Sequence, residues 1–141
     1  MNGLPVDAEY TSALGVAVYA FATLEWDAIR CCERIRPGSI EELEDRTAGR
    51  VADTLIHLAR GLAEPERQLR LLQAGTDFRS YVGTRNNLLH AKPGVDPEGK
   101  QRLFRDGDMW TLDELRSVAL AFAGCSDDLK AWLDGPAEAR R

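Results

Sequence analysis

The segment FRSYVGTRNNLLH, residues 78–90, is the stretch on which the predicted fold depends. At about 100° per residue, Phe78, Val82 and Leu89 share one face of a helix, and Arg85 lies at the centre of that face. An apolar face predicts packing against another helix, so we expect Arg85 to point into an interface. A charge in that position needs a partner.

Glu25 is the partner that the sequence offers. A long first helix is predicted from about Asp7, its N-cap, to about Arg36, before Pro37-Gly38. Its apolar stripe is formed by Tyr10, Leu14, Ala17, Val18, Phe21, Ala28, Ile29, Cys32 and Ile35. Because Glu25 lies within this stripe, we expect Glu25 and Arg85 to approach each other between the first and third helices. Such a pairing would by itself explain Arg85 as a structural residue.

Two further helical regions follow the first. Ser39-Ile40-Glu41-Glu42 has the form of a capping box and predicts a second helix that continues to about Leu62. Pro65 suits the first turn of a third region, which Gly75-Thr76 interrupts. The sequence leaves open whether residues 65–90 form one kinked helix or two.

A different pattern precedes the last helix. Residues 92–99, KPGVDPEG, are predicted to form a loop because they hold two prolines and two glycines. Asp106-Gly107 between short apolar groups is a hairpin signal. Thr111-Leu112-Asp113-Glu114 repeats the capping-box pattern and starts a helix that ends at Gly135-Pro136. We therefore predict an all-α fold, an up-and-down bundle of four to five helices with a short hairpin-like insert before the last helix.

The composition bounds the class of protein. The 141 residues, 44% apolar and 29% charged, suit a single domain over residues 1–141. We expect no membrane span and no signal peptide, because no apolar run is long enough and the N-terminus lacks a basic region. Three cysteines without a CxxC pattern are interpreted as reduced thiols of a cytoplasmic protein, and no metal site or cofactor is expected.

Charge is distributed unevenly along the chain. The net charge is −5, which argues against general affinity for nucleic acid. Residues 79–105, however, hold six basic and two acidic side chains, a local charge of +4 that leaves −9 for the rest. This basic segment is either a solvated loop or a surface for an anionic partner.

The spacing within residues 85–90 imposes a condition of its own. Asn86 and His90 are four residues apart, so they share a helical face and are able to form a hydrogen bond. Arg85 and His90 are five apart, about 140° around a regular helix. They converge on one group only if the helix ends or distorts between them, or if a second copy of the chain completes the site.

Arg85-Asn86-Asn87-Leu88-Leu89-His90 resembles the R-x4-H motif of the HEPN superfamily. The similarity of layout covers most of the chain: a long first helix with an embedded glutamate, the motif late in the third helix, a loop and a closing helix. The resemblance implies a metal-independent endoribonuclease in which a ribose 2′-hydroxyl attacks the adjacent phosphate.

The resemblance also implies roles for individual residues. His90 would be the general acid or base, Arg85 would orient and stabilise the phosphate, and Asn86 would hold His90 or contact the scissile region. Glu25 and Tyr81 would support the site. Lys92, Arg102 and Arg105 would contact neighbouring RNA phosphates.

The family further implies a symmetric homodimer that completes the site, and a toxin or antiviral defence effector. Some members pair with an antitoxin that modifies a tyrosine just after the motif histidine. Ala91-Lys92-Pro93 follows here, without that tyrosine.

The alternative is a non-catalytic HEPN-like module that dimerises or binds a ligand or protein partner. In that case His90 is only a favourable residue at a helix C-terminus. Trp26, Trp110 and Trp132 are interpreted as core or interface aromatics, and His57 as a surface histidine without a chemical role.

Overall fold

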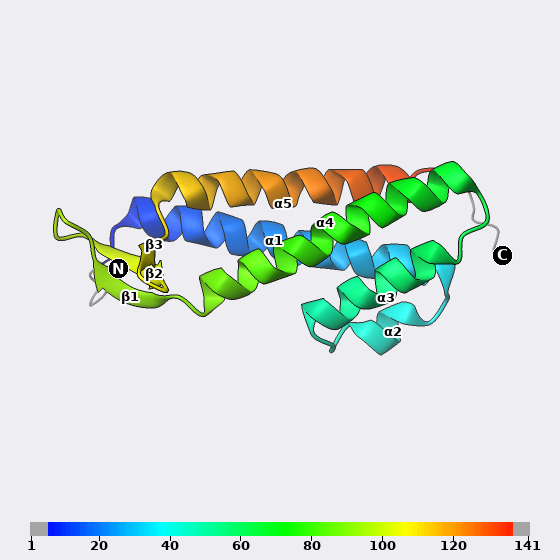
Figure 1. Cartoon of the computed structure of the whole chain (residues 1–141), viewed down its shortest axis with the longest axis horizontal. Helices are drawn as coiled ribbons and strands as arrows, with labels where there is room; N and C mark the ends of the chain where they lie inside the picture. Colours follow the sequence, from blue (N-terminus) through cyan, green and yellow to red (C-terminus); the bar gives the residue numbers. More distant parts are fainter. Residues whose placement is uncertain (1–5, 137–141) are drawn as a thin grey trace.

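Five helices and three short strands form within residues 6–136, the part of the chain that the computed structural model describes (Figure 1). In chain order they are α1 (Ala8–Ile35), α2 (Ser39–Leu43), α3 (Ala48–Arg60), α4 (Pro65–Leu89), β1 (Lys92–Val95), β2 (Gln101–Arg105), β3 (Asp108–Met109) and α5 (Leu112–Leu133). The predicted all-α bundle with a hairpin insert before the last helix is confirmed. None of these helices is both long enough and apolar enough to cross a lipid bilayer.

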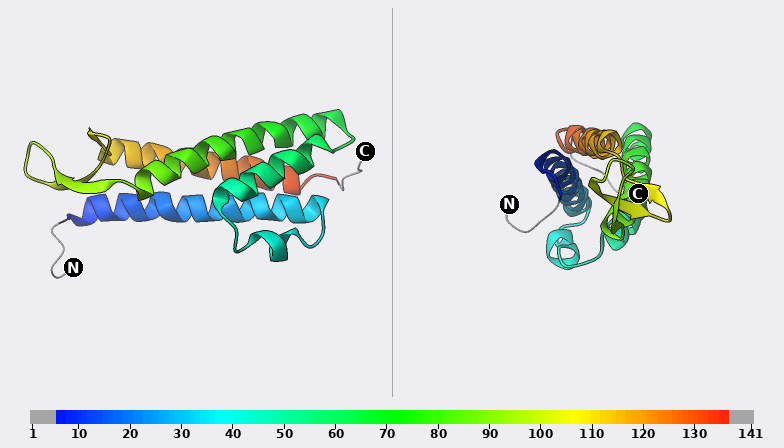
Figure 2. Two further views of the ribbon diagram at one scale, coloured as in Figure 1. Left: turned by 60° about the horizontal axis from the view of Figure 1, so that its bottom comes forward. Right: turned by 90° about the vertical axis from the view of Figure 1, so that its left-hand side faces the viewer.

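The helices α1 and α5 lie side by side and form the most extensive interface of the bundle. Both begin at the end that carries the sheet, so they run in the same direction (Figures 1 and 2). Asp7 caps α1 as predicted, because its carboxylate accepts a hydrogen bond of 2.8 Å from the Tyr10 N–H. Thr111 and Glu114 form the predicted capping box at the start of α5.

A buried carboxylate joins α1 to α5. Asp27 on α1 is only 1% exposed, and it accepts a hydrogen bond from the Ser126 hydroxyl on α5. Lys130 Nζ lies 3.7 Å from the same carboxylate, and Arg30 donates to it at 3.2 Å. Burial of a charge is tolerated here because every contact is a donor or a cation.

The second helical region is two helices, not the single helix predicted. Gly38, in the left-handed region at φ 99°, precedes α2, and the Ser39 side chain makes no cap. The carboxylate of Glu33 instead accepts hydrogen bonds from the N–H groups of Gly38 and Ile40. Thr47, which lies inside the predicted single helix, caps α3 by accepting from the Arg50 N–H at 3.2 Å. Because the Thr47 side chain caps the first turn of α3, a new helix begins there, and the second helical region is divided into α2 and α3.

The helix α4 is continuous through Gly75-Thr76, which settles the choice that the sequence left open. Gly75 is buried against α3, where a Cβ atom would lie 3.3 Å from Ile56 Cγ1. Glycine at this position therefore permits close helix packing and does not mark a break.

A three-stranded antiparallel sheet in the order β1-β2-β3 caps one end of the bundle. Asp106 and Gly107 have φ values of 51° and 85°, which places the predicted hairpin turn between β2 and β3. Part of the predicted loop is a strand, since Lys92 pairs with Phe104 and Val95 with Gln101. Proline is compatible with an edge strand, and Gly94 leaves room for the Phe104 ring, which lies 2.7 Å from where a Cβ would be.

Replacing Ser126 by alanine removes a donor from the buried Asp27 carboxylate and is expected to lower the free energy of unfolding by about 1–3 kcal/mol. Ser117→Ala, at an exposed position of the same helix, is the matched control and is expected to change it by less than about 0.5 kcal/mol. Urea unfolding followed by circular dichroism measures both. Equal midpoints for the two variants would show that the Asp27–Ser126 contact does not stabilise the fold.

Candidate functional site

Arg85 lies between α4 and α1, as the sequence predicts. Its guanidinium carbon is 4.6 Å from the centre of the Phe21 ring, a cation–π contact. The Nε atom is buried and has no hydrogen-bond partner. The residue as a whole is half-buried.

The expected hydrogen-bonded pair of Arg85 with Glu25 does not form. Glu25 is half-buried, and burial raises the pKa of its carboxyl, while the nearby charge of Arg85 opposes the rise. The two groups are thus close enough to interact electrostatically. However, no residue from 6 to 136 forms an ion pair or hydrogen bond with the Arg85 side chain. The Arg85 guanidinium packs on the face of the Phe21 ring, and this contact takes the place of the expected pairing with Glu25.

His90 ends α4 and points away from the bundle core. It is the C-cap residue at φ −91° and ψ 1°, and its N–H donates 2.9 Å to the Asn86 carbonyl. Asn86 and His90 are both exposed, and within the described chain their side chains do not hydrogen-bond to each other. Because the helix is regular through Leu89, Arg85 and His90 stay about 140° apart.

The predicted orientation of Leu89, in the last turn of α4, is wrong. Leu89, expected on the buried face, is 53% exposed, whereas Leu88 is buried with Tyr10 and Leu115. The exposed Leu89 follows Arg85 by one turn. It therefore leaves an apolar surface beside the guanidinium.

The three basic residues assigned to RNA differ in how free they are. Lys92 is exposed on β1. Arg102 is engaged: it donates 2.8 Å to Asp7, and its guanidinium carbon lies 4.4 Å from the Tyr10 ring centre. The hydrogen bond to Asp7 is the main reason why the pKa of Arg102 is raised. Arg102 therefore ties β2 to the start of α1, and only Lys92 and Arg105 are left with little direct pairing.

Arg105 and Asn87 line a polar cavity of about 450 Å³ beside the motif. The other lining residues are Asp106, Asp108, Met109, Trp110 and Glu114. The Nε atom of Arg105 is buried without a hydrogen bond and lies 3.8 Å from the Asp106 carboxylate. No role was predicted for Asn87 from the sequence. Its proximity to the β2–β3 turn depends on the fold, and no sequence signal predicts it.

Tyr81 lies on the opposite side of the site from His90, toward the core. Its ring meets Phe122 edge to face at 5.6 Å, and burial raises the pKa of its hydroxyl. The structure thus brings Glu25, Tyr81 and Arg85 to the inner side of α4. Asn86, His90 and Lys92 are exposed. His57 is exposed on α3, as predicted.

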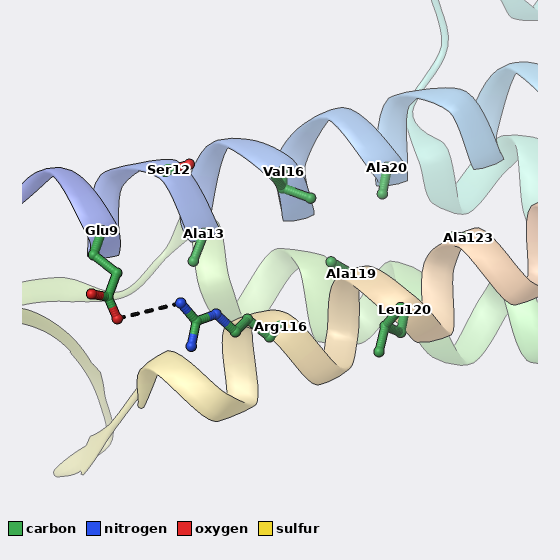
Figure 3. Close-up of a pocket in the computed structure, with 9 residues that line it drawn as sticks. All are labelled: Glu9, Ser12, Ala13, Val16, Ala20, Arg116, Ala119, Leu120 and Ala123. Atoms are coloured by element: carbon green, nitrogen blue, oxygen red, sulfur yellow. Dashed lines mark hydrogen bonds and ion pairs between the residues drawn. The ribbon is translucent and has the colours of Figure 1, made fainter.

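An apolar groove of about 510 Å³ lies elsewhere, between α1 and α5 (Figure 3). It contains no motif residue, and sequence analysis did not identify it. Helical periodicity identifies residues that face the core, whereas Val16 and Leu120, which line the groove, face outward.

Comparison with known proteins leaves the motif without an external reference. No protein-family model matches the chain, and no curated protein or solved structure matches it either.

Glu25→Gln is expected to raise the urea midpoint of unfolding at pH 7. Since burial raises the pKa of Glu25, the folded state holds its proton to higher pH than the unfolded state, and stability falls as pH rises through that window. Glutamine removes this cost. Below the ordinary glutamate pKa of about 4.3 both forms are uncharged, so the difference is expected to vanish.

A Glu25→Gln midpoint that lies below wild type at pH 7 would mean that attraction to Arg85 outweighs the burial of the carboxylate. Glu66→Gln, at an exposed position of α4, is the control for the loss of one surface charge.

Proposed function

We propose that the chain is a HEPN-like, metal-independent endoribonuclease whose R-x4-H site takes RNA at the exposed end of α4. The observation that carries the proposal is Arg85: a guanidinium held against Phe21, half-buried, with no direct anionic partner in the described chain. A cation fixed in this way is prepared for a phosphate oxygen, and its partial burial strengthens the attraction.

The proposed reaction is an internal transfer at phosphorus. The ribose 2′-oxygen forms a bond to the adjacent phosphorus as the bond to the 5′-oxygen of the next nucleotide breaks. The products are a 2′,3′-cyclic phosphate and a 5′-hydroxyl. His90 takes the proton from the 2′-hydroxyl or gives one to the leaving 5′-oxygen, since imidazole is both a base and, when protonated, an acid, and water exchanges the other proton.

A second copy would complete the site. In one chain Arg85 faces α1 while His90 is turned about 140° away, so one phosphate does not reach both side chains without a partner or a local change. Apolar surface for such a partner flanks Arg85: Val18, one turn before Phe21, is 43% exposed, and Leu89 is 53% exposed. A two-fold axis near this surface would bring Arg85 of one chain toward His90 of the other.

Basic side chains beyond the motif would hold the rest of the RNA. Lys92 is exposed two residues after His90, and Arg105 lies in the neighbouring polar cavity. Arg102 contributes to folding through Asp7 and is the weakest of the three candidates for a phosphate contact. Because the salt dependence grows with the number of phosphates neutralised, affinity carried by these few cations should fall only moderately with added salt.

A non-catalytic binding module is the second candidate. The observation in its favour is the same separation of Arg85 from His90 along a regular helix. In such a module Arg85 would bind an anionic ligand or partner, and His90 would only cap α4. An antitoxin partner and a role in defence are compatible with either candidate function.

Incubation with mixed single-stranded and hairpin RNA in the presence of excess chelator tests the enzyme. Wild type is expected to cleave, and His90→Ala to lose 10²–10⁴-fold in rate, which is the usual contribution of a general acid or base. His57→Ala is the matched control, because it removes the other histidine of the chain from an exposed position on α3. The products are identified by their cyclic phosphate ends.

Cleavage that survives in His90→Ala, or that disappears in chelator, would refute the proposed mechanism. A folded wild type that cleaves no RNA but binds it through Arg85, with the affinity lost in Arg85→Ala, would favour the binding module.

A further inference from the structure

The outward faces of α1 and α5 carry matching stripes at three- and four-residue steps. On α1 they are Ser12, Val16, Tyr19, Thr23 and Trp26, and on α5 they are Arg116, Leu120, Ala123 and Asp127. Large apolar side chains are exposed along these stripes: Val16 is 57% exposed, Tyr19 76% and Leu120 75%. Val16 and Leu120 line the groove between the two helices. A 3-4 spacing of this kind is the seam of helices that pack with a small crossing angle in four-helix bundles.

We propose that a second copy of this chain docks on the α1–α5 groove in the antiparallel sense, so that two α1–α5 pairs form a four-helix bundle. This proposal does not depend on the ribonuclease activity. The groove is lined by residues of α1 and α5 alone, and α4, which carries Arg85, lies behind these two helices in Figure 3. The motif surface therefore stays free in the docked pair.

The shape of the groove suits helix packing. Its floor is formed by small side chains such as Ala13, Ala20 and Ala119, between the taller Val16 and Leu120 (Figure 3). A second hollow of about 130 Å³ continues it, because Ala20 and Ala123 line both. The groove thus runs from Glu9 to Thr23, about 20 Å at 1.5 Å per residue.

Charges at the two ends identify a second copy as the occupant. One end carries Glu9 and Arg116, whose side chains are 3.3 Å apart, and the other end carries Asp127 and Lys130. An antiparallel two-fold axis level with the middle of residues 116–127 places Arg116 of each chain opposite the partner's Asp127. Both copies of the contact join opposite charges, and only apolar and small residues lie between them.

The area is sufficient for a specific pair. The face from Glu9 to Trp26 is about 26 Å long, and two adjacent helices are about 20 Å wide together, so each copy contributes about 500 Å². The two copies then bury about 1,000 Å², which is the lower bound for a stable specific interface. Central aliphatic and aromatic side chains with charges at the rim are the expected arrangement of such an interface.

Analytical ultracentrifugation of the full chain tests the proposal. Wild type is expected to be at least a dimer, and Leu120→Asp to halve its mass and weaken the association more than 100-fold, since two leucines leave the interface at once. Leu69→Asp is the matched control: Leu69 is 68% exposed on α4, outside the groove, and its loss should leave the mass unchanged.

Charge exchange tests the antiparallel register. Asp127→Arg alone is expected to raise the dissociation constant about tenfold, because it sets like charges opposite each other at two symmetric positions. The double variant Arg116→Asp with Asp127→Arg is expected to restore it to within about threefold.

Three results would overturn the proposal. The first is a wild type that stays monomeric at about 100 µM, which would leave the groove to a different protein. The second is a dimer that Leu120→Asp does not affect, which would place the interface elsewhere. The third is a double variant as weak as Asp127→Arg alone, which would exclude the antiparallel register.

Discussion

The ring of Phe21 is the contact on which the arrangement of the bundle depends. It lies 5.9 Å from the Phe78 ring of α4, 5.2 Å from the Phe122 ring of α5 and 4.6 Å from the guanidinium of Arg85. One side chain of α1 therefore joins the three longest helices and also holds the cation of the motif. Core packing and the placement of Arg85 are in this sense one feature, because a change that moves Phe21 moves the guanidinium with it.

Much of the fold followed from local rules. Asp7 and Thr111 cap α1 and α5 as the sequence predicts, and Asp106-Gly107 makes the hairpin turn. The errors occurred where a tertiary contact decided between local options. Gly75 is a packing position against Ile56, not a break, and residues 92–95 form a strand because β2 offers an edge beside them. Ile56 is too far from Gly75 in sequence for periodicity to show that contact. The strand at residues 92–95 was missed for a different reason, because its proline and glycine are typical of a loop.

The candidate site was predictable in its residues but not in its contacts. Helical spacing placed Arg85 inward and near Glu25, and it separated Arg85 from His90. It did not predict that an aromatic face would hold the guanidinium in place of the carboxylate. The difference bears on the proposed function. A carboxylate in a buried ion pair neutralises the arginine charge and weakens its attraction to a phosphate, whereas an aromatic ring leaves that charge uncompensated. The burial of Asp27 against Ser126 was not predicted. A carboxylate beside an apolar stripe is expected to be exposed unless its partner on another helix is known.

We propose that Arg85 is a fixed guanidinium whose directly bound anion is supplied by RNA. The most direct test is the nitrogen-15 NMR spectrum of the arginine Nε–H groups during titration with an uncleavable 2′-deoxy oligonucleotide, with the Arg85 signal assigned from Arg85→Lys. We predict that the Arg85 Nε–H signal shifts as the oligonucleotide is added, and that the shift reverses with added salt. An Arg85 signal that stays unchanged while the protein is saturated with oligonucleotide would contradict the account.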